Sequence, residues 1–171
     1  MSNVVITGIP AVKHQFAAIE AFLASTKPME GIVTDIKDII LTKTSNGVDY
    51  MGKSFAPYSE TYAKRRKGRT AKGRPNLKRT GTMLHNIYTK VDDSRHGRID
   101  IFPGAEPGGK GINSKFLAQV HTLGTTHAGK NNDITIPQRE FMNLAPSAVK
   151  KLTKKHYDDP ILILAKAARG K

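Results

Sequence analysis

A strongly basic run at residues 64–79 constrains the fold of this chain more than any other feature. Nine of its sixteen residues are basic and none is acidic. Burying unpaired ammonium or guanidinium groups costs several kcal/mol each, so the run must face water, an acidic partner or a polyanion. Gly68, Gly73 and Pro75 oppose regular structure, so we expect a long loop carried by a folded domain. The basic residues are Lys64, Arg65, Arg66, Lys67, Arg69, Lys72, Arg74, Lys78 and Arg79.

Length and charge indicate one basic domain. The chain has 171 residues, which is enough for a single domain with its own core. Its formal net charge is +14, and residues 51–98, with 13 basic and 3 acidic side chains, contribute +10 of it. Because a positive surface of this strength attracts phosphate, nucleic acid is an expected partner. The chain lacks cysteine, which excludes disulfides and thiol chemistry. No apolar run approaches the roughly 18 residues of a membrane span, so we expect a cytoplasmic site of synthesis and no membrane contact.

Apolar periodicity predicts an α+β fold in one domain spanning residues 1–171. We expect a helical N-terminal part over 1–45, a core over 50–145 and a helical C-terminal segment over 146–171. The apolar stripes of the N-terminal helices are interpreted as core packing. The core is expected to hold a small antiparallel sheet with packed helices and the long basic loop.

The predicted elements follow from helical and alternating spacing. Strands are predicted at 3–9, 87–91, 98–102 and 134–136, with the middle two forming a hairpin. Polar residues from 124 to 132 predict a loop. Helices are predicted at 12–25, from 29 to 42 after an interruption at Pro28, and at 58–66, 79–87, 114–121, 145–156 and, after a break at Pro160, 161–168.

No constellation of residues points to catalysis. The six histidines include no HExxH pattern. The adjacent acidic pairs Asp92-Asp93 and Asp158-Asp159 point apart on a regular element, unlike the spaced carboxylates of a two-metal nuclease. Residues 108–111 resemble a phosphate loop only in composition. We therefore expect no enzyme activity, cofactor or metal, and a metal-dependent nuclease ranks third among the functions considered.

Four short motifs follow one another along the chain. They are FxPYSxxYxxR at 55–65, LxxTGxxLxxI at 77–87, FxxxVHxxG at 116–124 and IPQREF at 136–141. Their order resembles the bacteriophage virion-morphogenesis, or tail completion, family, which comprises small neck proteins of tailed phages. The resemblance covers about residues 50–145. Phe116 replaces the tyrosine of the family pattern, and Glu140 replaces its proline.

The resemblance implies a non-enzymatic structural protein of the virion. Such a subunit would form a homo-oligomeric ring, expected to be hexameric, at the head-tail junction, after synthesis in the host cytoplasm. Its partners would be other neck, connector and tail proteins. Genomic DNA passing through the ring would meet the repeated basic surface without sequence specificity. The alternative, supported by charge alone, is a free-standing nucleic-acid-binding protein of ribosomal or chromatin type.

Motif residues near helix ends have expected structural roles. Thr80 is predicted to cap a helix N-terminus, and Gly81 to let the incoming chain pass closely. His121 and Gly124 are predicted to end a helix, with the glycine suited to a left-handed conformation.

The last motif combines a strand end with a buried ring. Pro137 is predicted to stop a strand, and Phe141 to be buried. Arg139 is then held at a defined point, where we expect it to bridge carboxylates either within the chain or on a neighbouring subunit.

Overall fold

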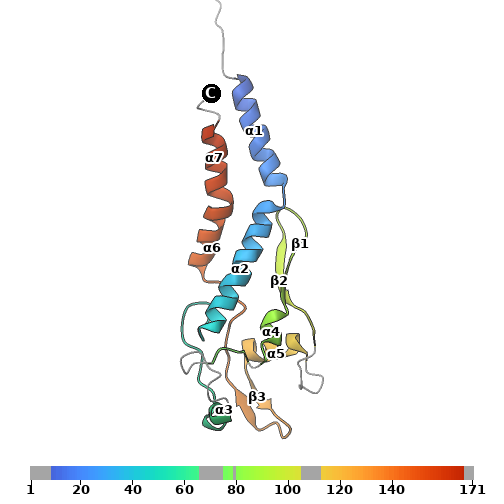
Figure 1. Ribbon diagram of the computed structural model, residues 1–171, viewed down its shortest axis with the longest axis vertical. Coiled ribbons are helices and arrows are strands. Elements are labelled where there is room, and N and C mark those ends of the chain that lie inside the picture. Colours follow the sequence, from blue (N-terminus) through green and yellow to red (C-terminus); the bar gives the residue numbers. More distant parts are fainter. Residues whose placement is uncertain (1–8, 66–74, 79, 105–112, 168–171) are drawn as a thin grey trace, which may run out of the picture. The chain divides into compact units, whose positions relative to one another are not determined.

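The computed structural model describes residues 9–65, 75–78, 80–104 and 113–167, and these form an α+β fold, as the sequence predicted (Figure 1). Strands β1 and β2 form one two-stranded sheet, and β3 and β4 form another. The elements in chain order are α1 (Ile9–Ala24), α2 (Lys27–Ser45), α3 (Glu60–Arg65), α4 (Thr82–His85), β1 (Ile87–Val91), β2 (Gly97–Ile101), α5 (Ser114–Leu123), β3 (Thr125–Ala128), β4 (Ile134–Ile136), α6 (Pro146–Thr153) and α7 (Asp159–Ala167). The strand predicted at 3–9 lies outside the described residues except for Ile9, which begins α1.

The chain divides into two compact units. The helical unit comprises the residues up to Val33, Lys90–Arg98 and the residues from Ser147 onward. The motif unit comprises Thr34–Thr89 and Ile99–Pro146. All four sequence motifs fall within the motif unit. The single domain expected from the sequence stays a prediction.

Pro28 lies within the first turn of α2. Helices α1 and α2 agree with the two predicted helices, but Pro28 is the second residue of α2. A proline in the first turn breaks no helical hydrogen bond, because that N–H would have no partner within the helix. The Thr26 hydroxyl donates to the Glu30 carboxylate at 2.6 Å, and the Glu30 N–H donates to the Thr26 carbonyl at 2.9 Å. Thr26 and Glu30 thus fix the start of α2.

Side-chain contacts hold α1 against the C-terminal helices within the helical unit. Gln15 Nε2 donates to the Ala165 carbonyl at 2.7 Å. The Phe22 and Tyr157 rings meet edge to face, with centroids 6.4 Å apart. The Tyr157 hydroxyl also donates to the Ser94 carbonyl at 3.1 Å, which links the C-terminal helices to the β1–β2 turn.

Three of the four apolar residues in the predicted stripe of α1 are exposed, contrary to the expected core packing, and the fourth, Ile19, is partly buried. Val12, Phe16 and Leu23 are 47%, 62% and 42% exposed. The prediction failed because amphipathic spacing shows that a helix has an apolar row without showing what covers that row.

Pro160 does not break the C-terminal helix, although the sequence predicted a break there. A π-helical turn, Lys154–Asp158, joins α6 to α7. In that turn the Asp159 N–H donates to the Lys154 carbonyl, five residues earlier. Pro160 has no N–H to donate, and the wider turn accommodates it without ending the helix.

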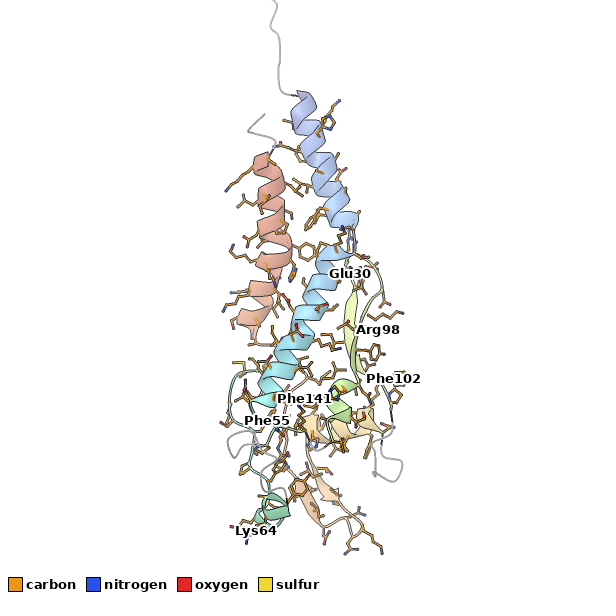
Figure 2. The ribbon with its side chains drawn as sticks, viewed as in Figure 1. Glu30, Phe55, Lys64, Arg98, Phe102 and Phe141 are labelled. Carbon is orange, nitrogen blue, oxygen red and sulfur yellow. The ribbon has the colours of Figure 1, made fainter. Side chains whose placement is uncertain are left out.

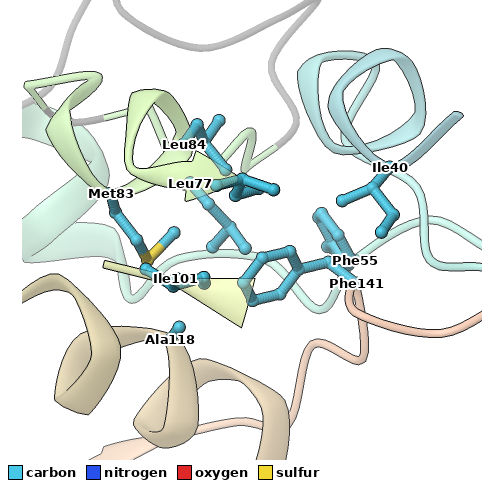
Figure 3. Packing of buried hydrophobic residues seen from close by; sticks show 9 residues of the cluster. Ile40, Phe55, Leu77, Met83, Leu84, Ile101, Ala118 and Phe141 are labelled. Atoms are coloured by element: carbon cyan, nitrogen blue, oxygen red, sulfur yellow. The ribbon is translucent and has the colours of Figure 1, made fainter. Parts of the chain in front are cut away.

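A buried apolar cluster forms the core of the motif unit (Figure 3). It draws on α2, α4, α5, both strands of the first sheet and the segments that carry the first and last motifs. Phe141 is 2% exposed, which confirms its predicted burial. The members are Ile40, Phe55, Leu77, Met83, Leu84, Ile87, Ile101, Ala118 and Phe141.

The polar segment predicted as a loop at 124–132 begins with a strand. β3 pairs antiparallel with β4, with Thr125 opposite Ile136 and Ala128 opposite Ile134. Gly129 and Asn132, with φ of +85° and +55°, lie in the connection between the two strands. Threonine is β-branched and favours strands, but the polar composition concealed this short one.

Candidate functional site

Arg139 joins the last motif to the first. Its Nε and Nη2 atoms lie 3.1 and 3.0 Å from the Ala56 carbonyl oxygen, and Nη2 lies 3.2 Å from the Pro57 carbonyl oxygen. The guanidinium also stands over the Tyr58 ring, 5.1 Å from its centroid. Arg139 is only 3% exposed, so these contacts replace the water that the cation has lost.

The predicted carboxylate partner of Arg139 is not found among the residues that the structure describes. In the described ranges Arg139 forms no ion pair, and its partners are backbone carbonyl oxygens. Burial lowers the pKa of Arg139, and the two nearby tyrosines, Tyr58 and Tyr62, act in the opposite direction. An arginine in proteins stays charged, so the site holds a buried cation solvated by carbonyl dipoles and an aromatic face. Sequence reasoning missed Tyr58 as the platform for Arg139. The sequence signal that could have revealed this contact was the presence of Pro57-Tyr58 in the first motif together with Arg139 in the last.

The third motif packs directly against the last one. The Arg139 N–H donates to the His121 carbonyl at 2.7 Å. Gly124 follows the last residue of α5, and its N–H donates to the Val120 carbonyl at 2.9 Å. Its φ of +72° confirms the predicted need for glycine. A Cβ at Gly124 would lie 2.8 Å from the Gln138 backbone nitrogen, so the last motif passes too close for any other residue.

His121 is a partly buried, neutral imidazole near this cation. Burial, followed by the charge of Arg139, lowers the pKa of His121 to about 4. Its Nδ1 atom is buried and has no hydrogen-bond partner among the described residues. The imidazole is therefore uncharged at neutral pH, which is the state that partial burial near the Arg139 charge favours.

The second motif enters the core through its apolar residues. Leu77 and Leu84 are both buried in the cluster shown in Figure 3. Thr80 is not the N-cap residue of this helix, although its hydroxyl does satisfy one free N–H at the helix start as predicted. Gly81 occupies the N-cap position of α4 with φ of 89°, and the Thr80 hydroxyl accepts from the Thr82 N–H at 3.3 Å. The predicted helix at 79–87 shortens to α4, because Gly81 has a left-handed backbone conformation and Ile87 begins β1.

Both flanks of the basic run belong to the motif unit. Lys64 is exposed in α3, which contains Arg65 as well (Figure 2). Lys78 is exposed next to the buried Leu77. Phe55 on the N-terminal side and Leu77 on the C-terminal side enter the same core. The remaining basic residues predicted to bind a partner, Arg66, Lys67, Arg69, Lys72, Arg74 and Arg79, lie outside the described residues.

The comparisons with known proteins do not assign this chain to a family. Comparison with known protein families, curated proteins and solved structures finds no match to it. Across the described ranges, no three His, Asp or Glu side chains gather where they could hold a metal ion. In the same ranges, no helix has both the length and the apolar character needed to cross a bilayer.

Proposed function

We propose that this chain is a structural subunit of a tailed-phage virion, which completes the tail and joins it to the head in a ring around the DNA path. The proposal assigns it no catalytic activity. Its location would be the neck of the particle, and its partners other copies of itself and the adjoining connector and tail proteins. The proposal begins from the order of the four motifs.

The convergence of the four motifs in one packed unit supports the proposal most. Each motif is short, and a chance match would leave its residues unrelated in space. Here Arg139 of the last motif bonds to Ala56 of the first and to His121 of the third. Leu84 of the second shares a core with residues of the first and last. Residues of all four motifs therefore take part in one connected set of contacts.

The charge of the motif unit supports contact with DNA in the proposed ring. The basic run is part of a segment, residues 51–98, with a net charge of +10. A ring repeats that segment in every subunit, which raises the positive potential around its lumen. Contacts to phosphate carry no sequence information, which suits a passage through which a whole genome moves.

Phage particles made without this chain test the proposal. We expect electron micrographs to show filled heads and separate tails, because the joining ring is absent. Supplying the chain from a plasmid should restore joined particles. Normal heads joined to normal tails in its absence would overturn the proposal.

The charge distribution also supports a free-standing nucleic-acid-binding protein as a second candidate. That protein would associate with nucleic acid in the cell and would not copurify with particles. Quantitative mass spectrometry of gradient-purified virions separates the two functions. A fixed copy number per particle supports the ring, and loss of the chain on purification supports the alternative.

A further inference from the structure

Helix α3 is too short to be stable by its own hydrogen bonds. It spans six residues, Glu60–Arg65, whereas isolated helices in water need about 12 to 15 residues even in favourable sequences. The Ala63 N–H donates to the Ser59 carbonyl at 2.8 Å, but a single turn of such bonds does not offset the backbone entropy that is lost when a helix starts. Contacts outside the helix must therefore hold α3 in place.

The Tyr62 side chain supplies such a contact. Its ring meets the Tyr58 ring edge to face, with centroids 4.9 Å apart. The Arg139 guanidinium covers the Tyr58 ring, 5.1 Å from its centroid, and is itself buried and hydrogen-bonded to the backbone. Tyr58 therefore lies against an immobile group, and Tyr62 packs on Tyr58. These three residues, Arg139, Tyr58 and Tyr62, are the Arg139 cluster.

The Arg139 cluster leads from the interior of the motif unit to an exposed cation. Arg139 is 3% exposed and Tyr62 is 37% exposed. Lys64, two residues after Tyr62, is exposed in α3 (Figure 2). The acidic residue of α3, Glu60, is in its first turn, whereas Lys64 and Arg65 end the helix. The positive charge of α3 therefore lies at the end where the basic run begins.

We propose that the Arg139 cluster orders α3 and thereby presents Lys64 to the phosphate backbone of duplex DNA. This inference rests on the DNA contact in the proposed function and names the residues that position one of its cations. Tyr58 and Tyr62 are positioning residues, because they act through α3 and not on the phosphate. A surface that is ordered before its ligand arrives avoids the entropy cost of ordering during association, which raises its affinity. The competing ligand is an acidic protein surface.

Substitutions of Tyr62 separate positioning from direct contact. Tyr62→Leu removes the edge-to-face contact at a partly exposed position, whereas Tyr62→Phe keeps the ring. Tyr88→Leu is the matched control, because Tyr88 is also 37% exposed and its ring also meets a second ring, that of Phe102, edge to face. All three variants are made in the full-length chain, and thermal unfolding verifies that each one is folded.

Titration with a mixed-sequence DNA duplex measures the effect on binding. We expect Tyr62→Leu to raise the Kd about threefold to tenfold, because α3 must then be ordered during association. The slope of log Kd against log salt should stay unchanged, since the same phosphates are neutralised in the complex. Tyr62→Phe and Tyr88→Leu should each change the Kd by less than about twofold.

Hydrogen exchange measures the order of α3 in the absence of DNA. The Ala63 amide should exchange at least about threefold faster in Tyr62→Leu than in the wild type or in Tyr62→Phe. Equal exchange in wild type and Tyr62→Leu would overturn the proposal, because α3 would then be ordered without the Tyr62 contact.

Three binding results would also overturn the proposal. One is equal weakening by Tyr62→Leu and Tyr88→Leu. Another is equal weakening by Tyr62→Leu and Tyr62→Phe, which would show that the Tyr62 hydroxyl contacts DNA directly. The third is a wild-type chain that binds polyglutamate and not DNA, which would make an acidic protein the ligand. Joined particles formed without the chain would overturn the proposed function while leaving the effect of Tyr62→Leu on DNA binding unchanged.

Discussion

The Arg139 guanidinium donates two hydrogen bonds to the carbonyl oxygen of Ala56, 83 residues earlier in the chain. The backbone N–H of Arg139 donates a hydrogen bond to the carbonyl oxygen of His121. One arginine thereby ties three separate segments of the motif unit together. Because its hydrogen-bond partners are backbone oxygens, the arrangement fixes where the chain runs, and the Tyr58 ring is the side chain that completes it.

Replacing Arg139 should destabilise the folded chain strongly. Arg139→Ala should lower the free energy of unfolding by about 3 kcal/mol, because it leaves buried carbonyl oxygens without donors. Arg139→Lys keeps the positive charge but loses the planar guanidinium and its paired N–H donors. It should therefore retain only part of the stability that Arg139→Ala loses. Arg98→Ala removes a half-exposed arginine and should cost less than about 1 kcal/mol. Urea denaturation measures all three. Equal losses for Arg139→Ala and Arg98→Ala would contradict the structural role.

Gly124 should tolerate no side chain. Gly124→Ala places a Cβ 2.8 Å from the Gln138 nitrogen and 3.1 Å from the Ile136 carbonyl oxygen, at a φ of +72°. Gly52→Ala is the matched control, because Gly52 has φ of +89° with no atom within 4 Å of the added Cβ. We expect about 1 to 2 kcal/mol for Gly52→Ala and at least about 3 kcal/mol for Gly124→Ala. Thermal unfolding compares them, and a similar loss in both would show that the backbone approach is unimportant.

His121 should make the free energy of unfolding depend on pH between the pKa of this histidine in the folded state and its pKa in the unfolded state. The pKa of His121 is about 4 in the folded state, against 6.5 for an unperturbed histidine. As pH falls below 6.5 the unfolded chain binds a proton that the folded chain does not, so stability decreases until about pH 4 and then levels off. The full effect is about 3 kcal/mol.

His121→Leu should remove this pH dependence without losing a hydrogen bond at Nδ1. His127→Leu changes an exposed histidine of β3 and should leave the dependence in place. Urea denaturation at several pH values from 4 to 7.5 measures the slope. The same slope in wild type and His121→Leu would show that another group is responsible.

The basic run should give the chain sequence-independent affinity for duplex DNA. Replacing Lys64, Arg65, Arg66 and Lys67 with glutamine should weaken binding to all sequences alike. The slope of log binding constant against log salt should flatten by about 0.9 for each phosphate that the variant no longer neutralises. Replacing Lys150, Lys151, Lys154 and Lys155 with glutamine gives the same change in net charge elsewhere, and should affect the slope less. Equal slopes in wild type and the first variant would point to an acidic protein partner.

Local pattern was enough to predict most elements and the burial of Phe141. Helical spacing located α1 and α2, and alternation located the β1–β2 hairpin, because both patterns are periodic over several residues. β3 was missed since its four residues include two threonines, a histidine and an alanine, with no apolar alternation. The π-helical turn before Pro160 was missed because a proline normally predicts a helix end.

The partners in the candidate site depended on tertiary contacts that no local pattern contains. The sequence indicated that Arg139 is held at a fixed point, but its partners are carbonyl oxygens, which every residue possesses. Likewise, the spacing of Val12 and Phe16 predicted an apolar row but could not show that both side chains are exposed.

Localisation of the chain on intact virions tests the central proposal most directly. A small tag at the C-terminus, labelled with gold-conjugated antibody and imaged by negative stain, marks the position of each copy. The account predicts label concentrated where the tail meets the head, and none on particles that carry the untagged chain. Label distributed along the tail or over the head, or tagged chain that does not copurify with particles, would contradict it.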